Sequence, residues 1–129
     1  MKNSSKEDIY SKVKNELLSM EFEYLGKLPS DYEGFWRVVE YEDITIKILV
    51  DIESPYCLWS KVVIEMRSSI QTGIRIQESI RNLRRDGSIA YLINKGLKFI
   101  KDDYCERIKG KATEVYTGNR GCGIQVNCI

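Results

Sequence analysis

Histidine is absent from this 129-residue chain. Its absence excludes Ser-His and Cys-His catalytic pairs and the HExxH zinc motif, and it removes the commonest general base near neutral pH. Carboxylate, lysine and cysteine chemistry remain open. Asp102 and Asp103 are adjacent, but successive helical side chains diverge by about 100°, so an i,i+4 pair between Asp103 and Arg107 is the preferred interpretation. We therefore expect a protein that is not an enzyme and has no catalytic residues.

Long apolar runs are also missing. No stretch approaches the roughly 18 residues that a membrane span requires, and the first residues, "MKNSSKEDIYSKVKNELL", lack the continuous apolar region of a secretory signal. The sequence therefore predicts a cytoplasmic protein with no membrane partner. A composition of 43% hydrophobic and 30% charged residues is typical of globular proteins, and the length suits a single domain over residues 1–129.

Closely spaced cysteine pairs are absent too. The four cysteines lie far apart, and no spacing matches a zinc site or a CxxC redox motif. Because no export signal is visible, free thiols are favoured over a disulfide framework. We expect neither a metal site nor a cofactor. The four thiols belong to Cys57, Cys105, Cys122 and Cys128.

Charge is distributed unevenly along the chain. Residues 21–54 hold nine acids against three bases, whereas residues 55–101 hold nine bases against three acids. The two blocks can face each other or solvate their own elements, or they can form oppositely charged surfaces that steer a charged partner.

Hydrophobic periodicity predicts the elements. Helical spacing extends from about Lys6 to Met20, and strict alternation from Ile44 to Ile52 predicts a strand. The flanking segments "FWRVVEY" and "CLWSKVVIEMR" resemble neighbouring strands of a meander. Two helices are expected next, one marked by Ile76, Ile80 and Leu83, the other running from Ser88 to Ile108. "TEVY", "TGNRG" and "CGIQVNCI" then predict a hairpin, because "TGNRGCG" lacks phosphate-loop spacing.

The predicted fold is α+β: an antiparallel sheet, made of a three-stranded meander plus a C-terminal hairpin, with helices packed on one face. The predicted order is α-β-β-β-α-α-β-β.

Two surfaces are candidates for binding. If the strand at residues 57–67 alternates regularly, Trp59 lies among charged residues on the open sheet face, as an interface hot spot does, although a covering loop is an equal alternative. The predicted partner-binding residues are Tyr32, Trp36, Glu40, Glu42, Asp43 and Trp59. The predicted helix "RIQESIRNLRRDG" offers an alternative nucleic-acid site at Arg75, Arg81, Arg84 and Arg85, or simply a solvated face.

The stretch "LPSDYEGFW" resembles the L-P-x-D-Y-x-x-F signature near the N-terminus of the SUKH superfamily. The matching residues are Leu28, Pro29, Asp31, Tyr32 and Phe35. The resemblance implies a bacterial immunity protein that neutralises a toxin by binding. From the residues alone, Pro29 and Ser30 favour a turn that opens a helical turn, with Glu33 completing an S-x-x-E capping box and the aromatics packing or binding.

These observations favour a non-catalytic protein-binding module, most simply a bacterial immunity or inhibitor protein that occludes the active site of a toxin or other enzyme. The alternative is a protein that binds nucleic acid or a nucleotide through the arginine-rich helix.

Overall fold

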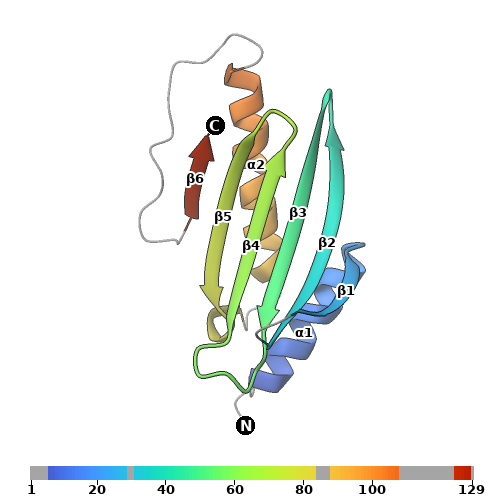
Figure 1. Cartoon of the computed structure of the whole chain (residues 1–129), viewed down its shortest axis with the longest axis vertical. Coiled ribbons are helices and arrows are strands. Elements are labelled where there is room, and N and C mark those ends of the chain that lie inside the picture. The colour runs from blue at the N-terminus through green and yellow to red at the C-terminus, as the bar shows by residue number, and fades with distance from the viewer. Residues whose placement is uncertain (1–5, 29–30, 84–87, 108–123, 129) are drawn as a thin grey trace.

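A six-stranded antiparallel sheet with helices on one face forms the molecule (Figure 1). The computed structural model describes residues 6–28, 31–83, 88–107 and 124–128. Only the backbone is described in the last of these ranges. Neighbouring strands follow one another in sequence, so the sheet is a continuous meander. In chain order the elements are α1 (Lys6–Ser19), β1 (Glu23–Leu28), β2 (Tyr32–Tyr41), β3 (Ile44–Glu53), β4 (Lys61–Ser68), β5 (Thr72–Ser79), the 3-10 helix η2 (Ile80–Leu83), α2 (Ser88–Arg107) and β6 (Ile124–Cys128).

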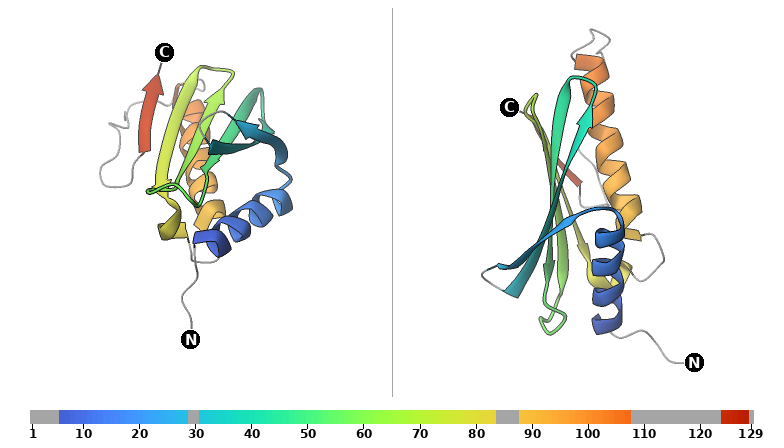
Figure 2. Two further views of the ribbon diagram at one scale, coloured as in Figure 1. Left: turned by 60° about the horizontal axis from the view of Figure 1, so that its bottom comes forward. Right: turned by 90° about the vertical axis from the view of Figure 1, so that its right-hand side faces the viewer.

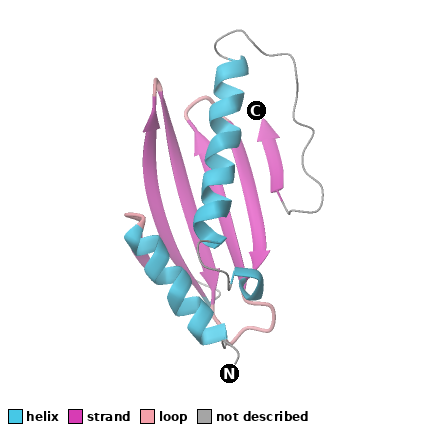
Figure 3. Ribbon diagram, turned by 180° about the vertical axis from the view of Figure 1, so that it is seen from behind, coloured by secondary structure: helices cyan, strands magenta, loops and turns pink. Residues whose placement is uncertain are grey.

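The core lies between the sheet and the two α-helices. Figure 2 shows α1 and α2 on the same side of the sheet. In Figure 3, which is the view from behind, both helices lie in front of the strands. Every second residue of β3 from Ile44 to Ile52 is buried against them, as its alternation predicts. Alternate residues of β4 and β5, such as Ile64 and Ile76, continue this layer. None of the described helices lies on the opposite face, which is called the open face below.

Helix α2 approaches the sheet closely at Gly96. A Cβ at this position would lie 2.8 Å from Cδ1 of Ile74 and 2.8 Å from Cε of Met66. The glycine weakens the helix intrinsically, but it lets the helix backbone sit directly on β4 and β5. Leu97, Ile100 and Tyr104 extend the same contact toward the C-terminal end of α2.

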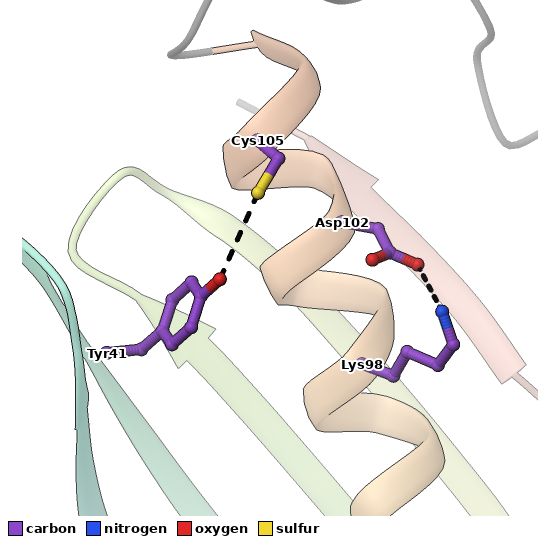
Figure 4. A network of polar contacts seen from close by, with 4 residues as sticks. All are labelled: Tyr41, Lys98, Asp102 and Cys105. Atoms are coloured by element: carbon purple, nitrogen blue, oxygen red, sulfur yellow. Dashed lines mark hydrogen bonds and ion pairs between the residues drawn. The ribbon is translucent and has the colours of Figure 1, made fainter.

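The C-terminal end of α2 meets the β2–β3 turn. The hydroxyl of Tyr41 lies 3.9 Å from Sγ of Cys105 (Figure 4), and the hydroxyl of Tyr104 donates to Asp43 at 3.5 Å. Glu42 adopts a φ of 53° in this two-residue turn, in the region that tight hairpins require.

The predicted order of elements is wrong, although the fold is α+β. Residues 23–28 form a strand, β1, that was not predicted, and residues 72–79 form β5 where a helix was expected. Ile74 and Ile76 face the core in alternation with Arg75 and Gln77, which is the period of a strand. Only Ile80–Leu83 turn helically, as η2. The helices predicted to begin at Lys6 and Ser88 are confirmed as α1 and α2, which extend to Ser19 and Arg107; Ile108 lies outside the described residues.

The predicted C-terminal hairpin is described only at its second strand. The segment Ile124–Cys128 is a strand, β6, but it pairs antiparallel with β5 at the edge of the main sheet. The residues expected to form the other strand of the hairpin and its turn lie outside the described part of the chain.

Candidate functional site

The β3–β4 loop, residues 54–60, begins with a turn that its sequence dictates. The amide of Cys57 donates to the carbonyl of Ser54 at 3.1 Å, closing a β-turn in which Pro55 takes the second position, where its fixed φ is favourable. The amide of Tyr56 donates to Oγ of Ser54 at 3.2 Å, as serine commonly does at the start of a turn. The first half of the loop is thus held by its own residues.

Ser60 locks the second half of the loop. It is fully buried with a φ of 46°, and its Oγ lies 2.9 Å from the carbonyl oxygens of both Ser54 and Cys57. Its own carbonyl accepts from the amide of Ile80 at 2.8 Å. The loop is therefore held both by its own residues and by the first residue of η2.

Three large apolar side chains project from this braced loop. Tyr56, Leu58 and Trp59 are 82%, 79% and 71% exposed. A loop that only connects two strands gains nothing from exposing such residues, whereas an interface does, because aromatic anchors on a preorganised backbone lose little entropy on binding. We call these three residues the apolar tip.

An acid-lined hollow of about 250 Å³ lies beside the apolar tip, between the loop and the N-terminal end of α1. Tyr56 and Pro55 form one side, and the carboxylates of Glu7, Asp31 and Glu33 line it together with Lys27. The amide of Ser54 donates to the carbonyl of Asp31 at 2.8 Å, so the loop and the β1–β2 connection are joined. The hollow is suited to a basic side chain.

Glu33 is the most enclosed of these acids. Lys14 Nζ lies 3.0 Å from its Oε1. Desolvation acts to raise the pKa of Glu33, but hydrogen bonds from Tyr10 and Lys14 outweigh it and hold that pKa below its usual value. Burial, followed by the Glu33 carboxylate, raises the pKa of Tyr10. Glu33 is therefore ionised and committed to α1. Glu33 belongs to β2, so the prediction that it completes a capping box is wrong. Asp31 has 3-10 helical conformation, and Pro29 and Ser30 lie outside the described residues.

The predicted partner-binding residues do not form one cluster. Tyr32, Trp36 and Glu40 share the open face of β2, and Glu42 and Asp43 form the β2–β3 turn. Trp59 is exposed as predicted, but it lies in the loop rather than on β4, which begins at Lys61. Strands rise about 3.3 Å per residue, so ten-residue β3 separates Trp59 from Glu42 by roughly 30 Å.

Of the six predicted partner-binding residues, only Tyr32 and Trp59 lie at the end of the sheet that carries the β3–β4 loop. Burial is the main cause that raises the pKa of Tyr32, followed by the carboxylates of Glu53 and Asp51. The chain therefore concentrates negative charge near the base of the loop.

The arginine site predicted on a helix is not formed as expected. Arg75 lies on β5 with its side chain on the open face, where it pairs with Glu65 at 3.6 Å. Arg81 belongs to η2. Arg84 and Arg85 lie outside the described residues. The structure thus separates Arg75 from Arg81 and assigns them to different elements.

The remaining candidates for chemistry have structural partners. Lys98 pairs with Asp102 at 2.9 Å (Figure 4), whereas Asp103 accepts a hydrogen bond from Oγ1 of Thr72. The two carboxylates thus point to separate partners; the side chain of Arg107 lies outside the description. Neither Cys57 nor Cys105 forms a disulfide with another described residue; Cys122 and the side chain of Cys128 lie outside the described part of the chain.

Within the described ranges, no cluster of three or more cysteines and carboxylates is arranged to hold a metal ion. Among the same residues, neither α-helix is both long and apolar enough to cross a membrane.

Sequence reasoning missed two members of the apolar tip, Tyr56 and Leu58. The signal was present in "SPYCLWS", because Ser-Pro marks a turn and turns expose the residues that follow. Reading Cys57 to Trp59 as strand residues hid that signal.

Comparison of the chain with models of protein families, with curated proteins and with solved structures found no match.

Proposed function

We propose that this chain is a non-catalytic protein-binding module whose β3–β4 loop inserts into a concave site of a partner protein. The observation that carries the proposal is the contrast between a loop base held by hydrogen bonds of Ser54 and Ser60 and an apolar tip exposed by 71% to 82%. A convex, rigid projection complements a cleft, and clefts are where enzymes bind substrates. The partner is an enzyme whose active site the loop occludes.

The acid-lined hollow defines the partner further. A Lys or Arg beside the occupied cleft would enter it and meet the carboxylates of Glu7 and Asp31. Basic clefts belong to enzymes that act on anionic substrates such as nucleic acids. A cytoplasmic immunity protein that neutralises a nuclease toxin has these requirements, and the SUKH-like stretch from Leu28 to Trp36 leads into the strand beside the loop. This combination supports a bacterial immunity role.

The test is a binding measurement with the protein encoded by the gene adjacent to this one. Calorimetry should give a stoichiometric complex with the unaltered chain. Trp59→Ala should weaken binding by about 2 kcal/mol or more, roughly thirtyfold, because a central aromatic anchor is lost. The matched control is Tyr91→Ala, which removes an aromatic that is 63% exposed on α2; its affinity should change by less than about 0.5 kcal/mol.

Stability and lipid binding complete this test. The free energy of unfolding of both variants should be within about 0.5 kcal/mol of that of the unaltered chain, since both side chains are exposed. An exposed Trp and Leu could also enter a bilayer interface, so sedimentation with phosphatidylcholine vesicles is run beside the calorimetry. Binding to vesicles that depends on Trp59 overturns the proposal. So does the absence of any complex, or a Trp59→Ala variant that binds as tightly as the unaltered chain.

A further inference from the structure

A second feature lies on the open face of the sheet, away from the loop. A groove of about 290 Å³ extends across the strands from Trp36 on β2 to Arg75 on β5. Leu49, Glu65 and Arg67 line it between these ends. The proposed binding of a protein by the loop makes no use of this groove.

Two cations in the groove lie on neighbouring strands. Lys47 on β3 lies directly opposite Arg67 on β4, and neither has an ion-pair partner among the described residues. Glu65, the nearby acid, is paired with Arg75. Like charges directly opposite on neighbouring strands destabilise a sheet. An anion bound between Lys47 and Arg67 would offset that repulsion.

An aromatic ring lies next to these cations. Trp36 pairs with Leu49, two residues along β3 from Lys47, and such diagonal neighbours on a sheet are about 7–8 Å apart. The indole Nε1 of Trp36 donates to Oε1 of Glu23 at 3.1 Å. That bond occupies the polar edge of the ring and fixes its orientation, which leaves its face available for stacking on a planar ligand.

The surrounding acids limit the size of the ligand. Asp51 and Glu53 lie on the open face toward the loop, and Glu40 lies on it toward the β2–β3 turn. A polyanion that continued in either direction along the strands would meet these carboxylates. The groove volume is also near the lower end for small-ligand sites. These features favour a compact anion with one aromatic ring over a nucleic-acid strand.

We propose that the groove binds a free nucleotide, with the base stacked on Trp36 and the phosphates between Lys47 and Arg67. Stacking of a base on an aromatic side chain and charge-assisted contacts to phosphate are the two interactions that nucleotide sites combine. Neither contact involves the apolar tip, so the nucleotide site and the protein-binding loop are tested independently.

The experiment uses the fluorescence of Trp36. The chain has two tryptophans, so Trp59→Phe leaves Trp36 as the sole reporter. Titration of this variant with ADP should quench the emission saturably. Pyrophosphate, which lacks a base, should cause little quenching, and a thymidine oligonucleotide should bind no more tightly per site than the mononucleotide. Added ADP should also raise the melting temperature, because the ligand binds the folded state.

Variants of the groove supply the decisive comparison. In the Trp59→Phe background, the pair Lys47→Gln and Arg67→Gln should weaken ADP binding at least about tenfold. The control is Lys61→Gln, which removes a cation of the open face that does not line the groove. With Trp59 restored, Trp36→Leu should weaken binding at least about fivefold by calorimetry.

Three results would overturn the nucleotide site. The first is the absence of saturable quenching and of a thermal shift with ADP. The second is binding of the oligonucleotide at least tenfold more tightly than ADP, which would indicate a strand-binding face. The third is equal loss of binding in Lys61→Gln and in the groove variants, which would indicate unspecific charge attraction. The Trp59→Ala test of the loop is unaffected by any of these.

Discussion

At the scale of single residues, Asp51 is the least well compensated group of the open face. Its buried Oδ1 has no hydrogen-bond partner among the described residues, and desolvation, followed by the Glu65 carboxylate, raises the pKa of Asp51. The neighbouring Gly34 lies opposite it on β2. The folded chain therefore disfavours the charge that Asp51 carries at neutral pH.

Replacement of Asp51 by Asn should stabilise the fold at pH 7. Because the folded pKa is above the unfolded value, the ionised carboxylate costs stability above that folded pKa. The cost disappears as pH falls below the unfolded value, near the ordinary 3.8. Denaturant unfolding of both chains between pH 3.5 and 8 should show an advantage for Asp51→Asn that is largest at neutral pH and absent near pH 3.5. An advantage that persists unchanged at the lowest pH would contradict this cause.

The pKa of Glu33 is shifted in the opposite direction from that of Asp51. Its folded pKa is lowered, so its pairing with Lys14 stabilises the fold above the unfolded pKa and is lost as pH falls through the folded pKa. The two carboxylates lie on opposite faces of the sheet, which explains why neighbouring acids on β2 and β3 respond differently to acid.

At the scale of elements, Gly96 sets how closely α2 packs on the sheet. Val at this position adds branches that must displace the buried ends of Ile74 and Met66. Overpacking of this kind costs about 1–3 kcal/mol. Asn94→Val is the matched control. Asn94 is exposed on the same helix, and asparagine and valine have similar helix propensities. Urea unfolding should show the cost in Gly96→Val and a change within about 0.5 kcal/mol in Asn94→Val. Equal stability of the two variants would show that the helix shifts without cost.

Elements with an unambiguous period were predictable from the sequence. The alternation of Ile44 to Ile52 fits only the two-residue period of a strand, and the apolar stripe of α2 fits only the helical period. Each element buries a single face, and that burial requires apolar residues at one period. In β5 two periods coincide. Ile76, Ile80 and Leu83 have helical spacing, while Ile74 and Ile76 alternate as in a strand, and pairing with β4 decided between the two.

The candidate sites depended on information that the sequence carries less directly. The sequence predicts that Trp59 is exposed, but it does not place Trp59 on a loop. That placement follows from Ser60, because its φ of 46° lies outside the extended region and β4 therefore cannot begin before Lys61. The groove depends on register: Lys47 and Arg67 are 20 positions apart in sequence, and only the pairing of β3 with β4 brings them opposite each other. Register is a property of the folded sheet.

At the scale of the whole molecule, charge and apolar contact are placed for different roles in binding. Acids gather around the base of the loop, in α1, the β1–β2 connection, β2 and β3, whereas the three residues of the apolar tip are uncharged. Electrostatic attraction acts over about 10 Å at 0.1 M salt and mainly accelerates association, while buried aromatic contacts mainly slow dissociation. The two sets of residues should therefore affect different rate constants.

Stopped-flow binding with the proposed partner enzyme separates these roles. Raising the salt concentration from 0.05 to 0.5 M should lower the association rate constant about tenfold or more and leave dissociation nearly unchanged. The pair Glu7→Gln and Asp31→Asn, in the hollow beside the tip, should reproduce part of that loss at low salt. Glu42→Gln, at the far end of the sheet, is the matched control and should have little effect because its distance exceeds the screening length. Trp59→Ala should instead accelerate dissociation. If salt changes dissociation alone, or if Glu42→Gln slows association as much as the pair does, the acids at the loop do not guide the encounter, and the partner's site is not basic.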